Sequence, residues 1–131
     1  MPTLPLSTYE RFTEFLHRRI DTKQHLTEDS VRYAFFLAVL QTTSIQQHEI
    51  ILELPHSRFP GKEVDTYIAA TDGCMELFFE FKFHRSSKST SPKPQKAGSL
   101  FKDISRLASL MSKDRHCLVV YLTCSEMARY F

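Results

Sequence analysis

The stretch GKEVDTYIAATDGCMELFFEFKFH, residues 61–84, decides the fold. Two segments of alternating polar and apolar residues, 62–70 and 75–84, lie on either side of Thr71-Asp72-Gly73. Such alternation is typical of half-buried β-strands, and Asp-Gly is a common sequence of tight hairpin turns. We therefore predict a β-hairpin at the centre of the chain.

The predicted hairpin places three charged side chains on one face. Because side chains alternate along a strand, Glu80 and Lys82 share the face opposite to Phe79 and Phe81, and Asp65 lies on the more polar face of the first strand. Counting equal numbers of residues outward from the turn brings Asp65 opposite Glu80, with Cβ atoms about 5 Å apart. Two carboxylates at that distance repel unless a cation joins them. Such a pair suits Mg²⁺, which binds oxygen ligands and keeps positions for water and phosphate.

Helices and one more strand precede the hairpin. The S-x-x-E pattern Ser7-Thr8-Tyr9-Glu10 resembles a capping box, and the spacing after it predicts a helix over 8–21. Thr27 is a second candidate N-cap, followed by a helix to about Thr43. Alternation over 48–54 predicts a first strand.

A helix and a strand follow the hairpin. Residues 86–94 form a polar, proline-containing loop, and 95–111 show helical periodicity. The apolar stripe of that helix is Leu100, Ile104, Leu107 and Leu110. The nearly continuous apolar run within 116–123 is typical of a strand buried on both faces, and 125–131 either begin a helix or fray. The order α-α-β-β-β-α-β predicts an α/β fold, with a four-stranded mixed sheet between helices.

Composition agrees with one soluble domain spanning 1–131. The chain has 131 residues, of which 42% are hydrophobic and 24% charged. The longest apolar run, Ala34–Leu40, is too short to span a bilayer, and no signal peptide is evident. Three cysteines in no metal-binding spacing favour a reduced, cytoplasmic protein.

Positive charge is concentrated in residues 85–106, which hold six Lys or Arg against one acid, Asp103. The six are Arg85, Lys88, Lys93, Lys96, Lys102 and Arg106. A basic segment beside a slightly acidic remainder suits binding of a polyanion. Charge alone favours the plainer alternative, a solvated loop and helix face.

The order of elements, with Val64-Asp65 on one strand and Glu80-Phe81-Lys82 on the next, resembles the PD-(D/E)XK nuclease superfamily. The resemblance covers about 27–123 and implies a restriction-endonuclease-like α-β-β-β-α-β core with an extra N-terminal helix. Val64 stands where the family motif has proline. Only the aspartate of that pair has chemistry to perform.

The resemblance implies a metal-dependent nuclease that hydrolyses phosphodiester bonds, with DNA as the expected substrate. Asp65 and Glu80 would hold Mg²⁺, for which Mn²⁺ would substitute, with the carbonyl of Phe81 and the carboxylate of Glu28 as further ligands. Lys82 would position the attacking water. The nucleic-acid contacts would come from Arg85, Lys88, Lys96, Lys102 and Arg106.

Two other functions remain open at this stage. One is a catalytically inactive nucleic-acid-binding module of the same fold, because folds outlive activities. The other is a small structural protein in which Glu-x-Lys occurs by chance. Whether the protein forms a homodimer is open. So is whether the chain is a minimal family member, a truncated product or one module of a larger protein.

Overall fold

The computed structural model describes residues 4–23, 25–69, 75–84 and 93–123. Helices α1 and α2 come first, followed by a short 3₁₀ helix η1, three strands, helix α3 and a last strand. The elements are α1 (Leu6–Asp21), α2 (Glu28–Thr42), η1 (Gln47–Glu49), β1 (Ile50–Pro55), β2 (Glu63–Ile68), β3 (Glu76–His84), α3 (Lys93–Ala108) and β4 (Arg115–Thr123). This is the predicted order. The segment 125–131, predicted to be a helix or frayed, lies outside the described residues.

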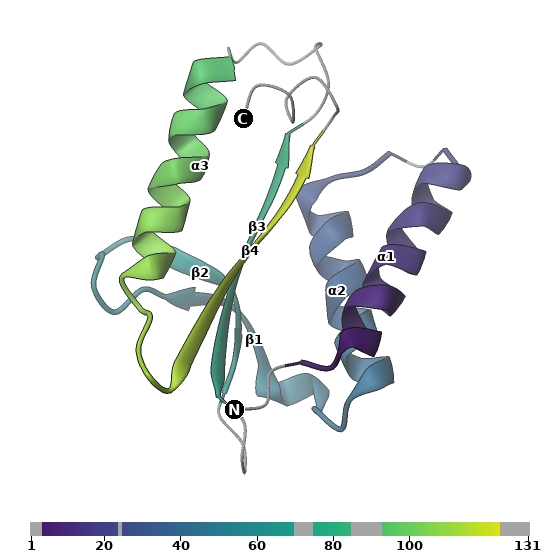
Figure 1. Cartoon of the computed structure of the whole chain (residues 1–131), viewed down its shortest axis with the longest axis horizontal. Coiled ribbons are helices and arrows are strands. Elements are labelled where there is room, and N and C mark those ends of the chain that lie inside the picture. The colour runs from purple at the N-terminus through teal and green to yellow at the C-terminus, as the bar shows by residue number, and fades with distance from the viewer. Residues whose placement is uncertain (1–3, 24, 70–74, 85–92, 124–131) are drawn as a thin grey trace.

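The four strands form one mixed sheet in the order β1-β2-β3-β4. β1 pairs antiparallel with β2 and β2 antiparallel with β3, whereas β4 pairs parallel with β3. The parallel pair requires a crossover, and α3 supplies it. Figure 1 shows α3 on one side of the sheet and α1 with α2 on the other. The predicted α/β class, mixed sheet and flanking helices are confirmed.

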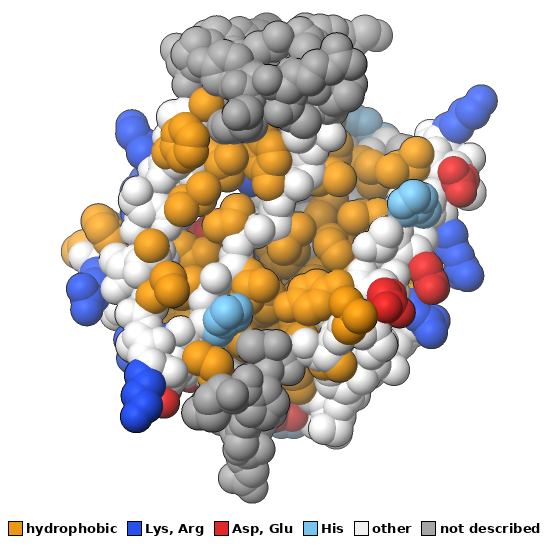
Figure 2. Space-filling view, viewed as in Figure 1, with side chains coloured by type: hydrophobic (Ala, Val, Ile, Leu, Met, Phe, Trp, Pro, Cys, Tyr) orange, Lys and Arg blue, Asp and Glu red, His pale blue; other side chains and the backbone are white. Residues whose placement is uncertain are grey.

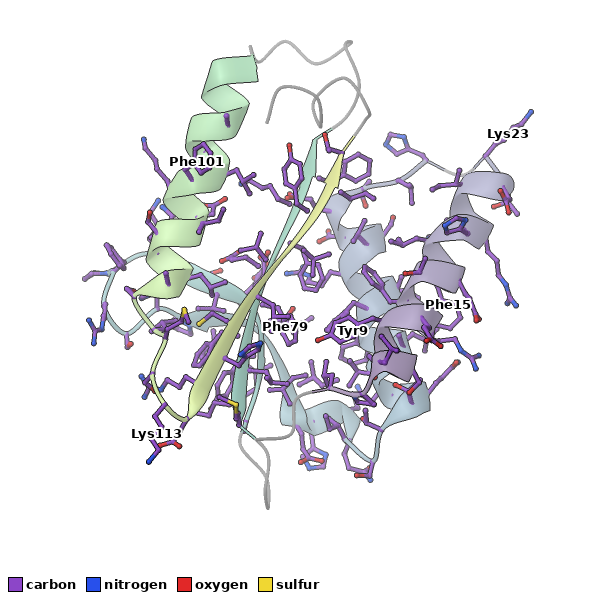
Figure 3. All side chains as sticks on the ribbon, viewed as in Figure 1. Tyr9, Phe15, Lys23, Phe79, Phe101 and Lys113 are labelled. Carbon is purple, nitrogen blue, oxygen red and sulfur yellow. The ribbon has the colours of Figure 1, made fainter. Side chains whose placement is uncertain are left out.

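The main apolar core lies between the sheet and the helices α1 and α2. Phe35 of α2 is 1% exposed, and its ring centroid lies 4.7 Å from that of Phe79 and 5.3 Å from that of Phe81. Phe12 of α1 contacts the ring of Phe35 edge-on, with the two centroids 5.5 Å apart. Figure 3 shows Phe79 on the sheet and Tyr9 on α1 within this layer. One phenylalanine of α2 thus joins both helices to β3.

A smaller apolar cluster lies on the α3 side. It consists of Val64, Phe78, Leu107 and Leu110, with Leu54, Tyr67, Cys117 and Val119 packed against them. The predicted stripe of α3 is correct for Leu100, which is 6% exposed, but wrong for Ile104, which is 37% exposed. The helix also ends at Ala108, so Leu110 packs from the following turn.

Two predicted helix starts had different outcomes. The predicted capping box at Ser7 is wrong, because α1 begins at Leu6 after Pro5 and no side chain caps it. The prediction for α2 is confirmed, since the backbone N–H of Ser30 donates to Oγ1 of Thr27 over 3.0 Å. The first strand starts two residues later than expected, because residues 47–49 form the 3₁₀ helix.

The alternation of side chains between the two faces of the sheet is interrupted within β1 and within β2. Ile50 packs in the main core, whereas Leu54, an even number of residues away, packs in the α3-side cluster. Glu53 lies between them with φ 57°, a left-handed conformation that is uncommon for a residue with a side chain. On β2, Val64 and Ile68 are likewise an even number of residues apart, yet they pack on opposite sides of the sheet.

Strand β4 forms one edge of the described sheet. Its residues from Arg115 to Thr123 are all half-buried, so the predicted full burial on both faces is wrong. Leu118, Val120 and Leu122 contact the main core from this edge. Figure 2 shows apolar side chains gathered along this side of the molecule, between α3 and the pair α1 and α2. Within the described ranges, no helix has the length and apolar character that crossing a bilayer requires.

Candidate functional site

The pairing of β2 with β3 brings the two predicted carboxylates together. Thr66 pairs with Phe79, Tyr67 with Phe78 and Ile68 with Leu77. One more step along this register sets Asp65 opposite Glu80, as counting from the turn predicts. The Glu80 carboxyl group is hydrogen-bonded to the Asp65 side chain. The backbone N–H of Phe81 donates to Oδ2 of Asp65 over 2.8 Å.

The environment of Glu80 favours its protonated form. Burial is the largest cause, followed by the hydrogen bond and the negative charge of Asp65 and then the charge of Asp103, and together they raise the Glu80 pKa to about 9. At neutral pH a proton therefore joins the two carboxyl groups. A cation at the same position would remove the same repulsion.

Lys82 lies beside the pair but is held from α3. Its Nζ is 2.5 Å from Oδ2 of Asp103, whose side chain is 13% exposed. Asp103 also forms an ion pair with Arg106, one turn further along α3. The Lys82 ammonium thus faces α3, on the same side of β3 as Glu80. Asp103 holds two cations at once.

A second cation approaches Asp65 from the other helical layer. Nη1 of Arg32, on α2, lies 3.8 Å from Oδ1 of Asp65 and 3.7 Å from Oε1 of Glu53. Its Nη2 is 2.9 Å from Oδ1 of Asp29. The Arg32 side chain is only 18% exposed. Its charge therefore acts on Asp65 with little screening by solvent.

Glu28 and Phe81 differ in how they stand relative to the predicted metal site. Oε1 of Glu28 accepts a hydrogen bond from the Phe83 N–H over 3.3 Å, toward the end of β3. Phe81 is adjacent to the site through its backbone N–H. Among the described residues, no group of three His, Cys, Asp or Glu side chains is close enough together to hold a metal ion. From α2, Arg32 approaches Asp65, whereas Glu28 contacts β3.

The predicted nucleic-acid contacts are only partly within the described structure. Arg85 and Lys88 lie outside the described residues, and the side chain of Lys96 is likewise not described. Lys102 and Arg106 line one cleft beside the site. The structure adds Arg32 and Asp103, which sequence reasoning did not place at the site. The only sequence signal was their spacing, since Asp29 with Arg32 and Asp103 with Arg106 are i,i+3 pairs.

Comparison with known proteins adds no relative. No protein-family model, no curated protein and no solved structure gives a significant match to this chain.

Proposed function

We propose that the protein is a metal-dependent nuclease with a restriction-endonuclease-like fold. The observation that carries the proposal is the convergence of Asp65 and Glu80 from adjacent strands, with Lys82 on the same face of β3. The register that sets Asp65 opposite Glu80, together with the hydrogen bond between their side chains, supports a shared cation at this position. Two carboxylates suffice for Mg²⁺, which takes its other ligands from water and from substrate phosphates.

Asp65 and Glu80 would hold the cation, and Phe81 would keep Asp65 in place through its N–H. When bound, the cation would stabilise the negative charge that develops on the phosphate oxygens. Lys82 would orient the water that attacks phosphorus in line with the leaving oxygen. Water adds its oxygen to phosphorus, the P–O bond to the leaving group breaks, and the displaced oxygen takes up a proton. The products are a phosphate monoester and a free hydroxyl group.

Thermal unfolding of the metal-free protein with Mg²⁺ or Mn²⁺ added tests this function. A ligand that binds only the native state raises the melting temperature. The rise should disappear in Asp65→Asn and persist in Glu63→Gln, which removes one exposed charge from the same strand. No rise in the wild type, with or without an added oligonucleotide, contradicts the metal site.

Cleavage of DNA by the wild type and by Lys82→Ala tests whether the protein is a nuclease and whether Lys82 orients the attacking water. Loss of a group that orients or deprotonates the nucleophile lowers the rate by roughly 10²–10⁴-fold. Metal stabilisation should remain in this variant, because Lys82 is not a ligand. Equal cleavage by both proteins would overturn the role of Lys82.

One observation favours a second candidate, a nucleic-acid-binding module without catalysis. Two of the three predicted catalytic side chains already have a partner of opposite charge within the protein, Lys82 with Asp103 and Asp65 with Arg32. A network closed in this way also suits a structural role. DNA binding that weakens with salt, without cleavage and without metal stabilisation, would support this candidate.

A further inference from the structure

A cleft of about 430 Å³ lies beside the carboxylate pair. Its lining residues are Lys62, Gly98, Ser99, Lys102, Asp103 and Arg106. Lys62 comes from the connection between β1 and β2, and the others come from α3. Asp103 belongs both to this cleft and to the ion pair with Lys82, so the cleft adjoins the candidate catalytic site.

The cleft carries uncompensated positive charge. Among the described lining residues, Asp103 supplies the one carboxylate, which is already paired with Arg106 and with Lys82. Within the described part of the chain, neither Lys62 nor Lys102 has a carboxylate partner, and both side chains are exposed. Cations gathered around one concave surface repel each other and attract an anion. The cleft therefore favours a negatively charged ligand.

Hydrogen bonds hold the two walls of the cleft in place. His56 is 8% exposed, and its backbone N–H donates to the carbonyl of Lys62 over 2.8 Å. Its Nε2 lies 3.0 Å from the carbonyl oxygen of Arg106, and its Nδ1 accepts from the N–H of Arg58 over 3.0 Å. The imidazole thus ties the segment that carries Lys62 to the helix that carries Arg106. The backbone that carries the cations is thus held in place, and the cationic side chains are what must become ordered when a ligand binds.

The chemistry of the lining suits phosphate. A guanidinium offers paired N–H donors that match phosphate oxygens, and ammonium groups act as point charges on the same anion. Ser99 adds a hydroxyl group to the wall. At Gly98 a Cβ would meet no atom within 4 Å, so the wall is open there.

We propose that this cleft binds a phosphate group of a nucleic-acid strand, next to the phosphate that is cleaved. Lys62, Lys102 and Arg106 are its cations. The inference rests on the proposed function for the identity of the strand, and it adds Lys62 and the location of the contact. Asp103 links the two positions, because it contacts Lys82 on one side and Arg106 on the other.

Binding of a 3′-fluorescein-labelled DNA oligonucleotide by the full chain in EDTA, followed by anisotropy, tests the proposal. We expect Lys62→Gln and Lys102→Gln each to weaken binding about tenfold and to reduce the slope of log affinity against log salt by about one. The matched control is Lys23→Gln, which removes the same charge at the far end of α1, away from α3 (Figure 3). Equal losses in all three variants, or no loss in the first two, would overturn the proposal.

A variant that leaves the charge unchanged separates the cleft from general electrostatics. Gly98→Leu places bulk at the open wall and should weaken binding without changing the salt slope, whereas Gly98→Ala should bind like the wild type. Wild-type affinity in Gly98→Leu would show that the strand does not enter the cleft. Melting temperatures of all variants check that each one is folded.

Three oligonucleotides, each labelled with fluorescein on an internal base, distinguish a terminal from an internal phosphate: one with a 5′-phosphate, one with a 5′-hydroxyl group, and one closed into a circle. A preference for the 5′-phosphate that Lys62→Gln abolishes assigns a strand terminus. Equal, Lys62-dependent binding of the circle assigns an internal phosphodiester. Both results support a phosphate site, and Lys62-independent binding of all three contradicts it.

The same measurements separate this inference from the proposed nuclease. Binding in EDTA does not depend on the cation at Asp65 and Glu80. Lys62-dependent binding without metal stabilisation or cleavage would leave the phosphate site and remove the catalytic function. If Lys62→Gln changes neither metal-dependent cleavage nor DNA affinity, the nuclease function is retained and the phosphate site in the cleft is contradicted.

Discussion

The two faces of β3 differ in what they pack against. Phe79 and Phe81 point to α1 and α2 and lie in the main apolar core. On the opposite face, Phe78 packs against the end of α3, whereas Glu80 and Lys82 further along form the polar site. One strand therefore carries both the largest packing contribution and the candidate chemistry, because its side chains alternate.

The apolar face of β3 helps the protein to tolerate a half-buried charged site on the opposite face. Burying Glu80 beside Asp65 is unfavourable, which its raised pKa records. The apolar face of the same strand offsets this with Phe79, which is 0% exposed. Functional sites commonly carry such local conflicts while the surrounding structure remains consistent.

The largest expected effect comes from the apolar face. Phe79→Ala should lower the free energy of unfolding by about 3–5 kcal/mol, because it removes a buried ring and leaves a cavity. Urea unfolding measures the loss. The control is Leu52→Ala on β1, where the side chain is 44% exposed and the change should stay within about 0.5 kcal/mol. A loss below about 1 kcal/mol for Phe79→Ala would show that the core is not centred on β3.

The polar face should respond next. Asp103→Asn leaves Lys82 and Arg106 without their shared carboxylate, and we expect a loss of about 1–3 kcal/mol in urea unfolding. The exposed Asp114→Asn is the matched control and should be nearly neutral. A more stable Asp103→Asn would mean that desolvation of the three charges outweighs their attraction.

The pH dependence of stability isolates Glu80. Its pKa is raised from 4.5 to about 9 in the native state, so between these values the native state holds a proton that the unfolded chain releases. The stabilisation is complete below the ordinary value and is lost as the pH rises through about 9. Melting temperatures of the metal-free wild type should therefore fall across this range.

Glu80→Gln is the variant that checks this. It keeps a neutral side chain at every pH, so its melting temperature should fall less than that of the wild type and exceed it above the raised pKa. Glu63→Gln on β2 serves as the control and should follow the wild type. Parallel curves for Glu80→Gln and the wild type would show that Glu80 does not hold the proton.

The sequence alone was sufficient to predict that Asp65 and Glu80 lie opposite each other on neighbouring strands. Counting outward from Asp72-Gly73 in the sequence predicts the register in which Thr66 pairs with Phe79, although Asp72 and Gly73 themselves lie outside the described residues. Asp65 and Glu80 meet for that reason. Local signals also located α2, where Thr27 caps the first turn. These features depend on contacts within the hairpin or within one helical turn.

The remaining partners of the site depend on how distant elements pack. Arg32 reaches Asp65 across 33 positions of the chain, and Asp103 reaches Lys82 from a helix that crosses the sheet. Nothing in the periodicity of α2 or α3 says which charged residue faces the sheet. The left-handed conformation of Glu53 could not be predicted from the sequence either, because glycine is the residue that usually marks such a position.

The smallest expected effect lies at the cleft wall and has the opposite sign. Gly98 is within α3, and a Cβ there would meet no atom within 4 Å. Gly98→Ala should therefore raise the free energy of unfolding by about 0.5–1 kcal/mol, because alanine loses less conformational entropy in a helix. The neighbouring Ala97 is 6% exposed, so Ala97→Gly should lose stability through both helix propensity and packing. Destabilisation by Gly98→Ala in urea would mean that other atoms occupy this side of α3, and the cleft would then be too small for a phosphate.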